Sequence, residues 1–544
     1  MSSSLHALRR RVRLRDEDGF TMLLAIGVMF VTGLLLVAAF TVANGEVSET
    51  RTNTFQRQAY YAALAGIQQY EAKLQAEPSY WQTCEAPSAN LPEEENQSYA
   101  VTVLVASTAP SGTEKCSTSS PFESVIESKG TLMNTFRIKS IGTVGTGKSK
   151  ATRSLIATFK VSGFLDYVYY TNFETEDPGL YEAPSGCAAK YRSEWSAKGL
   201  SCATITFTNS DDVKGPMHSN DAAKVEGTVA FGREGQSPAD SVEINGGTYP
   251  EAENECKSGS GEAKFYTSTK CYTAKGPTIL PPEGDTSLAQ YVESENHFTG
   301  ETRLALNGTS NTIEVTKVTA NAVTKKIETS TSTINWPKNG LIYVDGSCAE
   351  TTRSYAIDNE TEMYEKVSCG TVYVNGTYSK PLTVAGTNDV VVNGNIVPTG
   401  VTAGNAPTGT ATMGLIAGEF VRIYHPVKSG STNTLNSCSA ENLSSSEDPL
   451  KWGAMTNPWI YAAILSTNHS FFVDNFKCGK QLEELNVYGA IAQDYRGIVG
   501  QVGSSGYIKD YKYDSRLATD EPPYFLAPLK AGWKISRLTA PSPG

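Results

Sequence analysis

The first eighty residues carry a long apolar stretch that turns into a one-sided helical pattern. No charged residue occurs from Phe20 to Ala43, and about 24 helical residues at ~1.5 Å each would span the ~30 Å apolar core of a bilayer. Apolar residues then recur mostly at spacings of three and four as far as Leu74, which is typical of an amphipathic helix. Because Pro78 ends this pattern, we predict one helix over 20–77 whose first half spans a membrane.

Alternating apolar and polar runs follow the predicted helix between about Tyr99 and Val161. They read YAVTVLVAS, FRIKSIGTV and SLIATFKV, and such alternation indicates strands with one buried face. We therefore expect residues 78–162 to form a small β domain whose sheet packs against the amphipathic half of the helix.

The rest of the chain, 163–544, consists of short β-branched runs that end in Asn-Gly, Asp-Gly or Gly-Thr. Asn-Gly between apolar runs is a strong hairpin signal, but Gly376, Gly394 and Gly414 recur at a nearly even spacing. That spacing is close to one coil of a right-handed parallel β-helix. The predicted fold class is α+β, mostly β, with a right-handed β-helix as its body and a β-sandwich as the alternative. Residues 428–458 would be a loop between coils, held by Cys438.

Composition and charge narrow the class of protein. The chain has 544 residues, of which 39% are apolar and 47 are glycine, which is closer to a loop-rich extracellular β protein than to a helical enzyme. The net charge of −11 makes the chain a poor ligand for polyanions, so we expect no nucleic-acid partner.

Cysteine usage indicates the compartment. All ten cysteines lie after the apolar stretch and no CxxC pair occurs, so disulfides are favoured over zinc or redox sites. Disulfides place the body outside the cytoplasm. Short gaps suggest that sequence neighbours pair in five local bridges, although spacing alone leaves the connectivity open. The cysteines are Cys84, Cys116, Cys187, Cys202, Cys256, Cys271, Cys348, Cys369, Cys438 and Cys478.

The leader before the apolar stretch differs from a secretory signal peptide. Its five arginines should keep the N-terminus in the cytoplasm. The apolar stretch is longer than the ~7–15 residues of a signal-peptide core, and no small-x-small cleavage site follows it closely. We therefore expect a single-pass membrane protein with its body outside the cell.

The residues around Gly19 carry a family resemblance. DEDGFTM followed by an apolar helix resembles the type III signal of type IV prepilins and type II secretion pseudopilins. The continuation RTNTFQRQAYYAALAGIQQYEAKL resembles PilX-like proteins. The resemblance implies that a prepilin peptidase removes 1–19 by cleaving after Gly19 and methylates the new N-terminal Phe20. It also implies other pilin subunits and the membrane as partners.

One position departs from the family pattern. Most pilins carry glutamate at the fifth mature position, where the carboxylate can pair with the N-terminal amine of a neighbouring subunit in a low-dielectric core. Here that position is Leu24. Members without this glutamate are mostly minor subunits, notably the K-type pseudopilin. The resemblance thus implies a minor subunit at or near a filament tip that initiates assembly or contacts a surface. The alternative is a plain membrane-anchored binding protein without a filament.

A second resemblance covers the body in outline. GFLDYVYYTNFETEDP, the GPMHSND turn and GYIKDYKYDSRLATDEPPYFLAPLKAGWKI are similar to large pilin-like proteins known mostly from predicted actinobacterial sequences. This resemblance implies a topology more than an activity.

Candidate chemistry in the body is sparse. His218, with Asn220 and Asp221 beside it in GPMHSND, is the best single candidate for a site. Such a turn more often bonds its own backbone. Because no HExxH, EF-hand or GxSxG motif occurs, we expect no metal, no cofactor and no enzymatic activity.

Two weaker hypotheses concern ligands of the body. A β-helix enzyme acting on polysaccharides would need clustered carboxylates, and the candidates are Asp211, Asp212, Asp345 and Asp389. The 27 tyrosines could form a face that binds a surface glycan or protein, or they could pack in the core.

Overall fold

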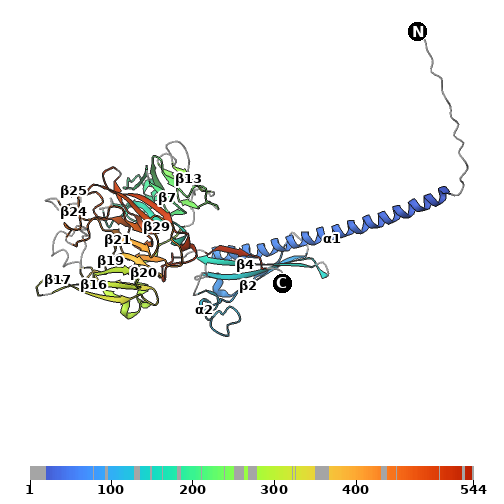
Figure 1. Cartoon of the computed structure of the whole chain (residues 1–544), viewed down its shortest axis with the longest axis horizontal. Helices are drawn as coiled ribbons and strands as arrows, with labels where there is room; N and C mark the ends of the chain where they lie inside the picture. Colours follow the sequence, from blue (N-terminus) through green and yellow to red (C-terminus); the bar gives the residue numbers. More distant parts are fainter. Residues whose placement is uncertain are drawn as a thin grey trace, which may run out of the picture.

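The computed structural model describes residues 20–541, without 92–95, 128–134, 181–184, 250–262, 268–277, 349–366, 430–437, 530–532 and a few shorter gaps. Gly19 with the predicted leader, and Cys256 with Cys271, therefore lie outside the described residues. The chain is an α+β protein that is mostly β, with one long helix at its start. Figure 1 shows this helix, a small sheet beside it and a larger β body beyond the sheet.

Helix α1 (Phe20–Ala76) is continuous over 57 residues, in agreement with the predicted span. Its second half is amphipathic as expected, because Ala63, Ile67, Tyr70 and Leu74 are completely buried on one face. The sequence also predicted that the first half spans a membrane. Over the part of the chain that the structure describes, no helix is found that is long and apolar enough to cross one.

The small sheet covers the buried face of α1. Its strands run in the order β1 (Ser88–Asn90), β2 (Gln97–Val103), β3 (Thr135–Val144), β4 (Ala151–Val161) and β32 (Trp533–Thr539). Every neighbouring pair in this sheet is antiparallel. The three predicted runs are β2, β3 and β4. The sequence-based division assigned all of 163–544 to the body, whereas the final strand β32 pairs with β4.

The core between α1 and this sheet is largely aromatic. Phe136 stacks on Phe159 with ring centroids 5.2 Å apart, and Trp533 of β32 meets Phe136 edge-on at 4.7 Å. Gly142 of β3 packs directly on the helix, since a Cβ there would overlap the carbonyl oxygen of Ala59. Such close approach needs a residue without a side chain.

The body is built from long parallel ladders. One ladder joins nine strands, each parallel to the next. In spatial order they are β14 (His297–Thr299), β18 (Leu341–Asp345), β20 (Leu382–Gly386), β22 (Met413–Ala417), β27 (Ala463–Ser466), β29 (Gln481–Arg496), β5 (Tyr169–Glu176), β8 (Met217–Ser219) and β11 (Val242–Ile244).

A second set of parallel strands faces the first across the main core. One run contains β15 (Thr302–Asn307), β19 (Val372–Tyr378), β21 (Val390–Pro398), β23 (Val421–Ile423) and β28 (Phe471–Val473). Another leads from β21 through β26 (Trp459–Ile460) and β29 to β31 (Ser505–Tyr513), β7 (Asp212–Lys214), β10 (Ala230–Phe231) and β13 (Lys264–Phe265).

Three groups of strands lie beside these ladders. Strands β16 (Thr312–Ala320) and β17 (Ile327–Asn335) extend antiparallel from β15. Strands β6 (Thr206–Thr208), β9 (Ala223–Glu226) and β12 (Thr248–Tyr249) form a separate parallel sheet. The predicted inserted loop 428–458 lies between β23 and β26, and its start contributes to an antiparallel pair of β24 (Val427–Ser429) and β25 (Cys438–Asn442).

The spacing argument for equal coils was partly wrong. Val372 pairs with Val390, which matches the predicted step from Gly376 to Gly394. The later steps along the sequence from one strand to its partner are longer: Val390 pairs with Val421, and Val421 pairs with Phe471. They are longer because loops are inserted between the strands. Gly414 lies on the other ladder, beside Thr383, so it does not repeat the place of the earlier glycines.

Disulfides join sequence neighbours in the described chain. The bridges are Cys84–Cys116, Cys187–Cys202 and Cys348–Cys369, as local pairing predicted. Cys478 is also disulfide-bonded, and none of the described cysteines is free.

Candidate functional site

The first half of α1 presents a continuous apolar surface, which we call the apolar rod and define as residues 22–38. Its large side chains are 55–73% exposed, from Met22 through Leu24 to Val37. The hydroxyl of Thr32 bonds the Val28 carbonyl within the helix, so it adds little polarity. A helix that is apolar all round is normally buried in a membrane or a protein core. The rod is therefore a strong candidate for contact with a partner or a lipid phase.

A cleft of about 790 Å³ lies between the small sheet and the body. Lys160 of β4 crosses the junction, where its Nζ lies 2.7 Å from Glu521 Oε1 and donates to the Ala518 carbonyl at 2.8 Å. The lining is mainly apolar, and a third of its residues are aromatic. Tyr291 is half exposed and stacks on Tyr524 at 5.3 Å. The lining also includes Trp81, Phe164, Leu288, Phe525 and Trp533.

Two groups of closely spaced tyrosines, at 167–170 and 507–513, are core residues. Tyr169, Tyr170, Tyr507, Tyr511 and Tyr513 are buried, so the sequence-based idea of an exposed tyrosine face applies to few of them. Tyr524, which follows the second group in the sequence, lines the cleft.

His218 is buried in a closed hydrogen-bond network. Its Nδ1 lies 2.8 Å from Glu243 Oε2 and its Nε2 lies 3.0 Å from Asn220 Oδ1. Asn220 in turn donates to the Ile279 carbonyl at 2.5 Å and accepts from the Ile279 N–H at 3.1 Å. Burial, the largest single effect, would raise the pKa of Glu243, but His218 together with the hydroxyl groups of Ser241 and Tyr167 outweighs it and lowers that pKa. The network fastens the segment at Ile279 onto the ladder.

Asp221 has a similar structural role. Its carboxylate accepts backbone N–H bonds from Arg192 at 2.7 Å, Ala222 at 2.8 Å and Glu174 at 3.2 Å. Burial raises the pKa of Asp221 to about 7, despite these bonds, which act to lower it. The GPMHSND turn therefore bonds its own surroundings, as the structural interpretation predicted.

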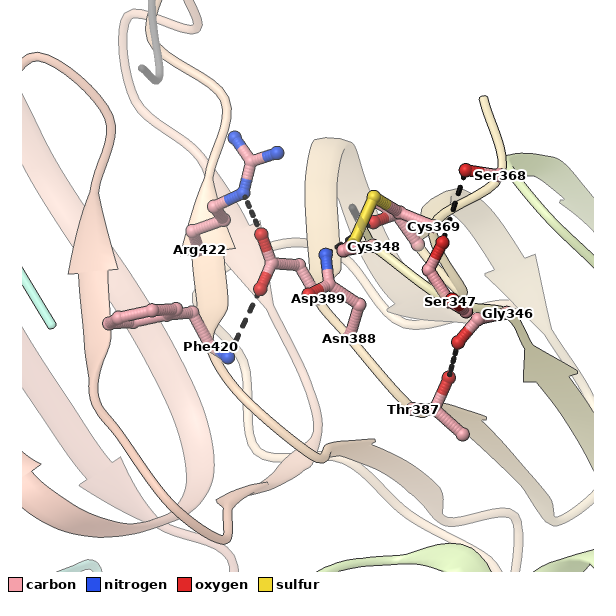
Figure 2. Close-up of a disulfide and its surroundings, with 11 residues drawn as sticks. Gly346, Ser347, Cys348, Ser368, Cys369, Thr387, Asn388, Asp389, Phe420 and Arg422 are labelled. Carbon is pink, nitrogen blue, oxygen red and sulfur yellow. Dashed lines mark hydrogen bonds and ion pairs between the residues drawn. A yellow bond between two sulfur atoms is a disulfide. The ribbon is translucent and has the colours of Figure 1, made fainter. Parts of the chain in front are cut away.

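The four candidate carboxylates each face a different basic side chain. Asp389 contacts Arg422 at 3.0 Å, and Figure 2 shows it pointing toward Arg422 and the Phe420 N–H, beside the Cys348–Cys369 disulfide. The other three pairs are Asp211 with Lys509 at 2.8 Å, Asp345 with His297 at 2.8 Å and Asp212 with Lys214 at 3.4 Å. Each of the four thus lies beside a basic side chain in the described chain.

Sequence reasoning missed a cluster around His469. Its Nδ1 lies 2.8 Å from Asp177 Oδ1, its Nε2 lies 3.1 Å from Glu419 Oε2, and its ring stacks on Phe420 at 4.4 Å. Burial alone would lower the pKa of His469, but the two carboxylates outweigh it and raise that pKa to about 9. Burial raises the pKa of nearby Asp494 to about 6.

A second missed cluster lies inside the body. Arg496 Nη1 contacts Glu174 Oε2 at 3.0 Å, and each side chain is only 1% exposed. The guanidinium lies over the Phe207 ring at 3.4 Å. The ion pair of Lys509 with Asp211 belongs to the same region, because all four charges influence the pKa of Arg496 or Lys509. The partners of each pair lie far apart in the sequence, so no local motif reveals them.

Within the described ranges, no group of three or more His, Cys, Asp or Glu side chains is placed to hold a metal ion. Comparison of the chain with protein-family models, curated proteins and solved structures finds no match.

Proposed function

We propose that the protein is a non-enzymatic, pilin-like minor subunit that assembles at or near the tip of a type IV pilus or related filament. The observation that carries the proposal is the division of α1 into two halves. The apolar rod is exposed on all sides, whereas the second half is packed on one face against a four-stranded antiparallel core of β2, β3, β4 and β32.

The exposed rod has an energetic consequence. Apolar surface in water costs roughly 25 cal/mol per Å², so a rod of this length needs a cover. In the proposed function a membrane covers the rod before assembly, with the N-terminus in the cytoplasm and the body outside. The helices of neighbouring pilin subunits cover it afterwards.

Leu24 supports the minor role. It is 60% exposed on the rod and offers no carboxylate to the N-terminal amine of a neighbour. Figure 1 shows the body lying beyond the small sheet, at the opposite end from the rod. A body of this size would be hard to stack along a shaft, so a tip position fits it best.

The proposed architecture of the body is a right-handed β-helix. Its support is the set of parallel ladders with regular inward and outward alternation. Val344, Val384 and Leu415 of three neighbouring strands lie in the main core, while Ala385 and Ile416 face a second cluster on the outside. The body would initiate assembly or contact a surface glycan or protein, and the aromatic cleft is the candidate place for that contact.

The test starts at the N-terminus of the membrane-extracted protein. Mass spectrometry should find a peptide that begins at N-methylated Phe20. Gly19→Leu should abolish this peptide, whereas the control Gly27→Leu should keep it, because a Cβ at Gly27 meets nothing within 4 Å. A mature chain that still starts at Met1 or Ser2 would contradict the proposal.

A second measurement separates a filament subunit from a plain anchored protein. Val31→Cys, at a position that is 55% exposed on the rod, should cross-link to other pilin subunits in membranes when the thiol carries a photo-activated cross-linker. If it cross-links to none while Phe20 is processed, the anchored binding protein becomes the better description.

A further inference from the structure

Two strands of the body that are far apart in the sequence lie side by side, and a buried lysine and aspartate are in contact there. Strand β31 lies parallel to β7, with Asp510 in register with Asp212. Lys509 and Asp211 each immediately precede these paired residues, so the register places them side by side. Lys509 Nζ lies 2.8 Å from Asp211 Oδ2 across 298 residues of sequence.

This pair is largely buried. The side chains of Lys509 and Asp211 are 13% and 4% exposed, and the Phe207 ring centroid lies 6.0 Å from the lysine Nζ. The Arg496–Glu174 pair beside them is 1% exposed on each side. Removing four charges from water carries a large desolvation penalty, which the ion pairs offset only in part.

The same surroundings disfavour the positive charge on the amine. Burial lowers the pKa of Lys509, the Arg496 charge lowers it further, and the attraction of Asp211 and Glu174 opposes them without reversing the shift. An uncharged lysine amine is a nucleophile, whereas the ammonium is not. Proton transfer from the Lys509 ammonium to the Asp211 carboxylate would give the two neutral partners of a condensation.

We propose that Lys509 and Asp211 form an intramolecular amide cross-link. The Lys509 Nζ attacks the Asp211 Cγ, a new N–C bond forms, one C–O bond of the carboxyl group breaks, and the oxygen leaves as water with two protons from the partners. No oxidant, reductant or activated co-reactant is needed, because the reaction is a dehydration of two groups that the chain itself supplies.

The geometry assists this step in two ways. Groups held in contact react with effective concentrations on the order of 10⁵–10⁸ M when they are well oriented. The Thr208 N–H donates to Asp211 Oδ2 at 3.0 Å, which would stabilise negative charge on an oxygen of the attacked carboxyl group. The product replaces two buried charges by one neutral amide, which removes most of their desolvation penalty.

A neighbouring pair provides a matched control. Lys214 of β7 lies 2.8 Å from Asp510 of β31, so it joins the same two strands at the same distance. Its side chain is 40% exposed. Burial opposes its charge, but Asp510 and Asp212 raise the pKa of Lys214, so this amine stays protonated. We expect no amide at Lys214.

The test is peptide mapping of the reduced, full-length protein by trypsin and mass spectrometry. Trypsin should fail to cleave after Lys509 and should release a branched peptide in which 199–214 is joined to 497–512. Its mass should be one water less than the sum of the two parts. Lys509→Arg should abolish the branched peptide completely, while Lys214→Arg should leave it in place.

The wild-type map decides without any variant. Recovery of free peptides 199–214 and 497–509 in full yield would show that the pair remains an ion pair, and would overturn the proposal. Persistence of the branched peptide in Lys509→Arg would assign the bond to another lysine and overturn it equally. Neither result depends on processing at Gly19, so this inference stands or falls separately from the filament proposal.

Discussion

Some single buried side chains in the body neutralise several opposite charges, and Arg422 is the clearest case. It is 8% exposed and contacts Asp389 at 3.0 Å and Asp474 at 2.8 Å, so it joins β23 to the turns at both neighbouring levels of the ladder. Removing one member of a buried ionic group leaves the others uncompensated.

Arg422→Met should therefore destabilise the body by about 3–5 kcal/mol, because two buried carboxylates lose their cation. Urea unfolding followed by tryptophan fluorescence measures the change. Arg537→Met is the control, since Arg537 is exposed on β32 and should shift the midpoint little. Equal midpoints for the two variants would refute this role of Arg422.

His469 predicts a pH dependence whose sign follows from its raised pKa. The folded value is about 9 against about 6.5 in an unfolded chain. The charged form is therefore favoured by folding, its stabilisation is complete below about pH 6.5, and it is lost as the pH rises through 9. Stability should fall by up to about 3 kcal/mol over this window.

Urea unfolding of wild type and His469→Gln at several pH values between 7 and 9.5 measures this contribution. The difference in unfolding free energy between the two proteins should shrink as the pH rises. Asp494, whose pKa is raised to about 6, titrates largely below this window, and Asp221, whose pKa is raised to about 7, titrates in both proteins. Parallel curves would rule out a charged His469.

The residues predicted from sequence and those missed differ in one physical respect. His218, Asn220 and Asp221 are near neighbours in sequence, so their shared environment could be anticipated. His469 and Asp177 are 292 residues apart, and their contact exists because loops at the ends of different strands converge. Single-sequence spacing contains no signal for such pairs.

At the scale of elements, local apolar periodicity predicted individual helices and strands, whereas the pairing of strands distant in sequence could not be predicted. Helix α1 and strands β2 to β4 followed from apolar patterns within short windows. Strand β32 could not be placed, because its position depends on pairing with β4, which lies on the far side of the whole body in the sequence. The number of residues between successive paired strands could not be predicted either, because inserted loops do not change the apolar pattern within a strand.

The contact of α1 with β3 yields a prediction for this element pair. Gly142→Ala should destabilise the small domain by about 1–3 kcal/mol, because the new methyl group overlaps the backbone at Ala59 and Ala63. Hydrogen exchange of the α1 amides over 59–74 measures the loosening. The control Ile141→Ala changes a 36% exposed neighbour, and comparable exchange in both variants would argue against tight packing.

At the scale of the whole molecule, the folded part and the apolar rod are separable. Among the α1 side chains that the structure describes, Ala59 is the first buried one, so a chain that starts at Thr52 keeps the described buried contacts between the helix and the sheet. This truncated chain should be monomeric without detergent and should keep its unfolding midpoint, whereas the full chain should need detergent. Light scattering after gel filtration measures both, and aggregation of the truncated chain would contradict the assignment of the rod as the part that associates.

The pairing of Val161 with Trp533 places the exit and the return of the body at adjacent positions on two neighbouring strands. The whole segment between Val161 and Trp533 therefore acts as a single long connection between two neighbouring strands of the small sheet. The entropic cost of closing a loop grows only with the logarithm of its length. The stability of the small sheet therefore depends only weakly on the length of this connection. The body is therefore an insertion between two strands of the small sheet. Evolution could enlarge, shorten or replace this insertion while the helix and the small sheet keep their fold.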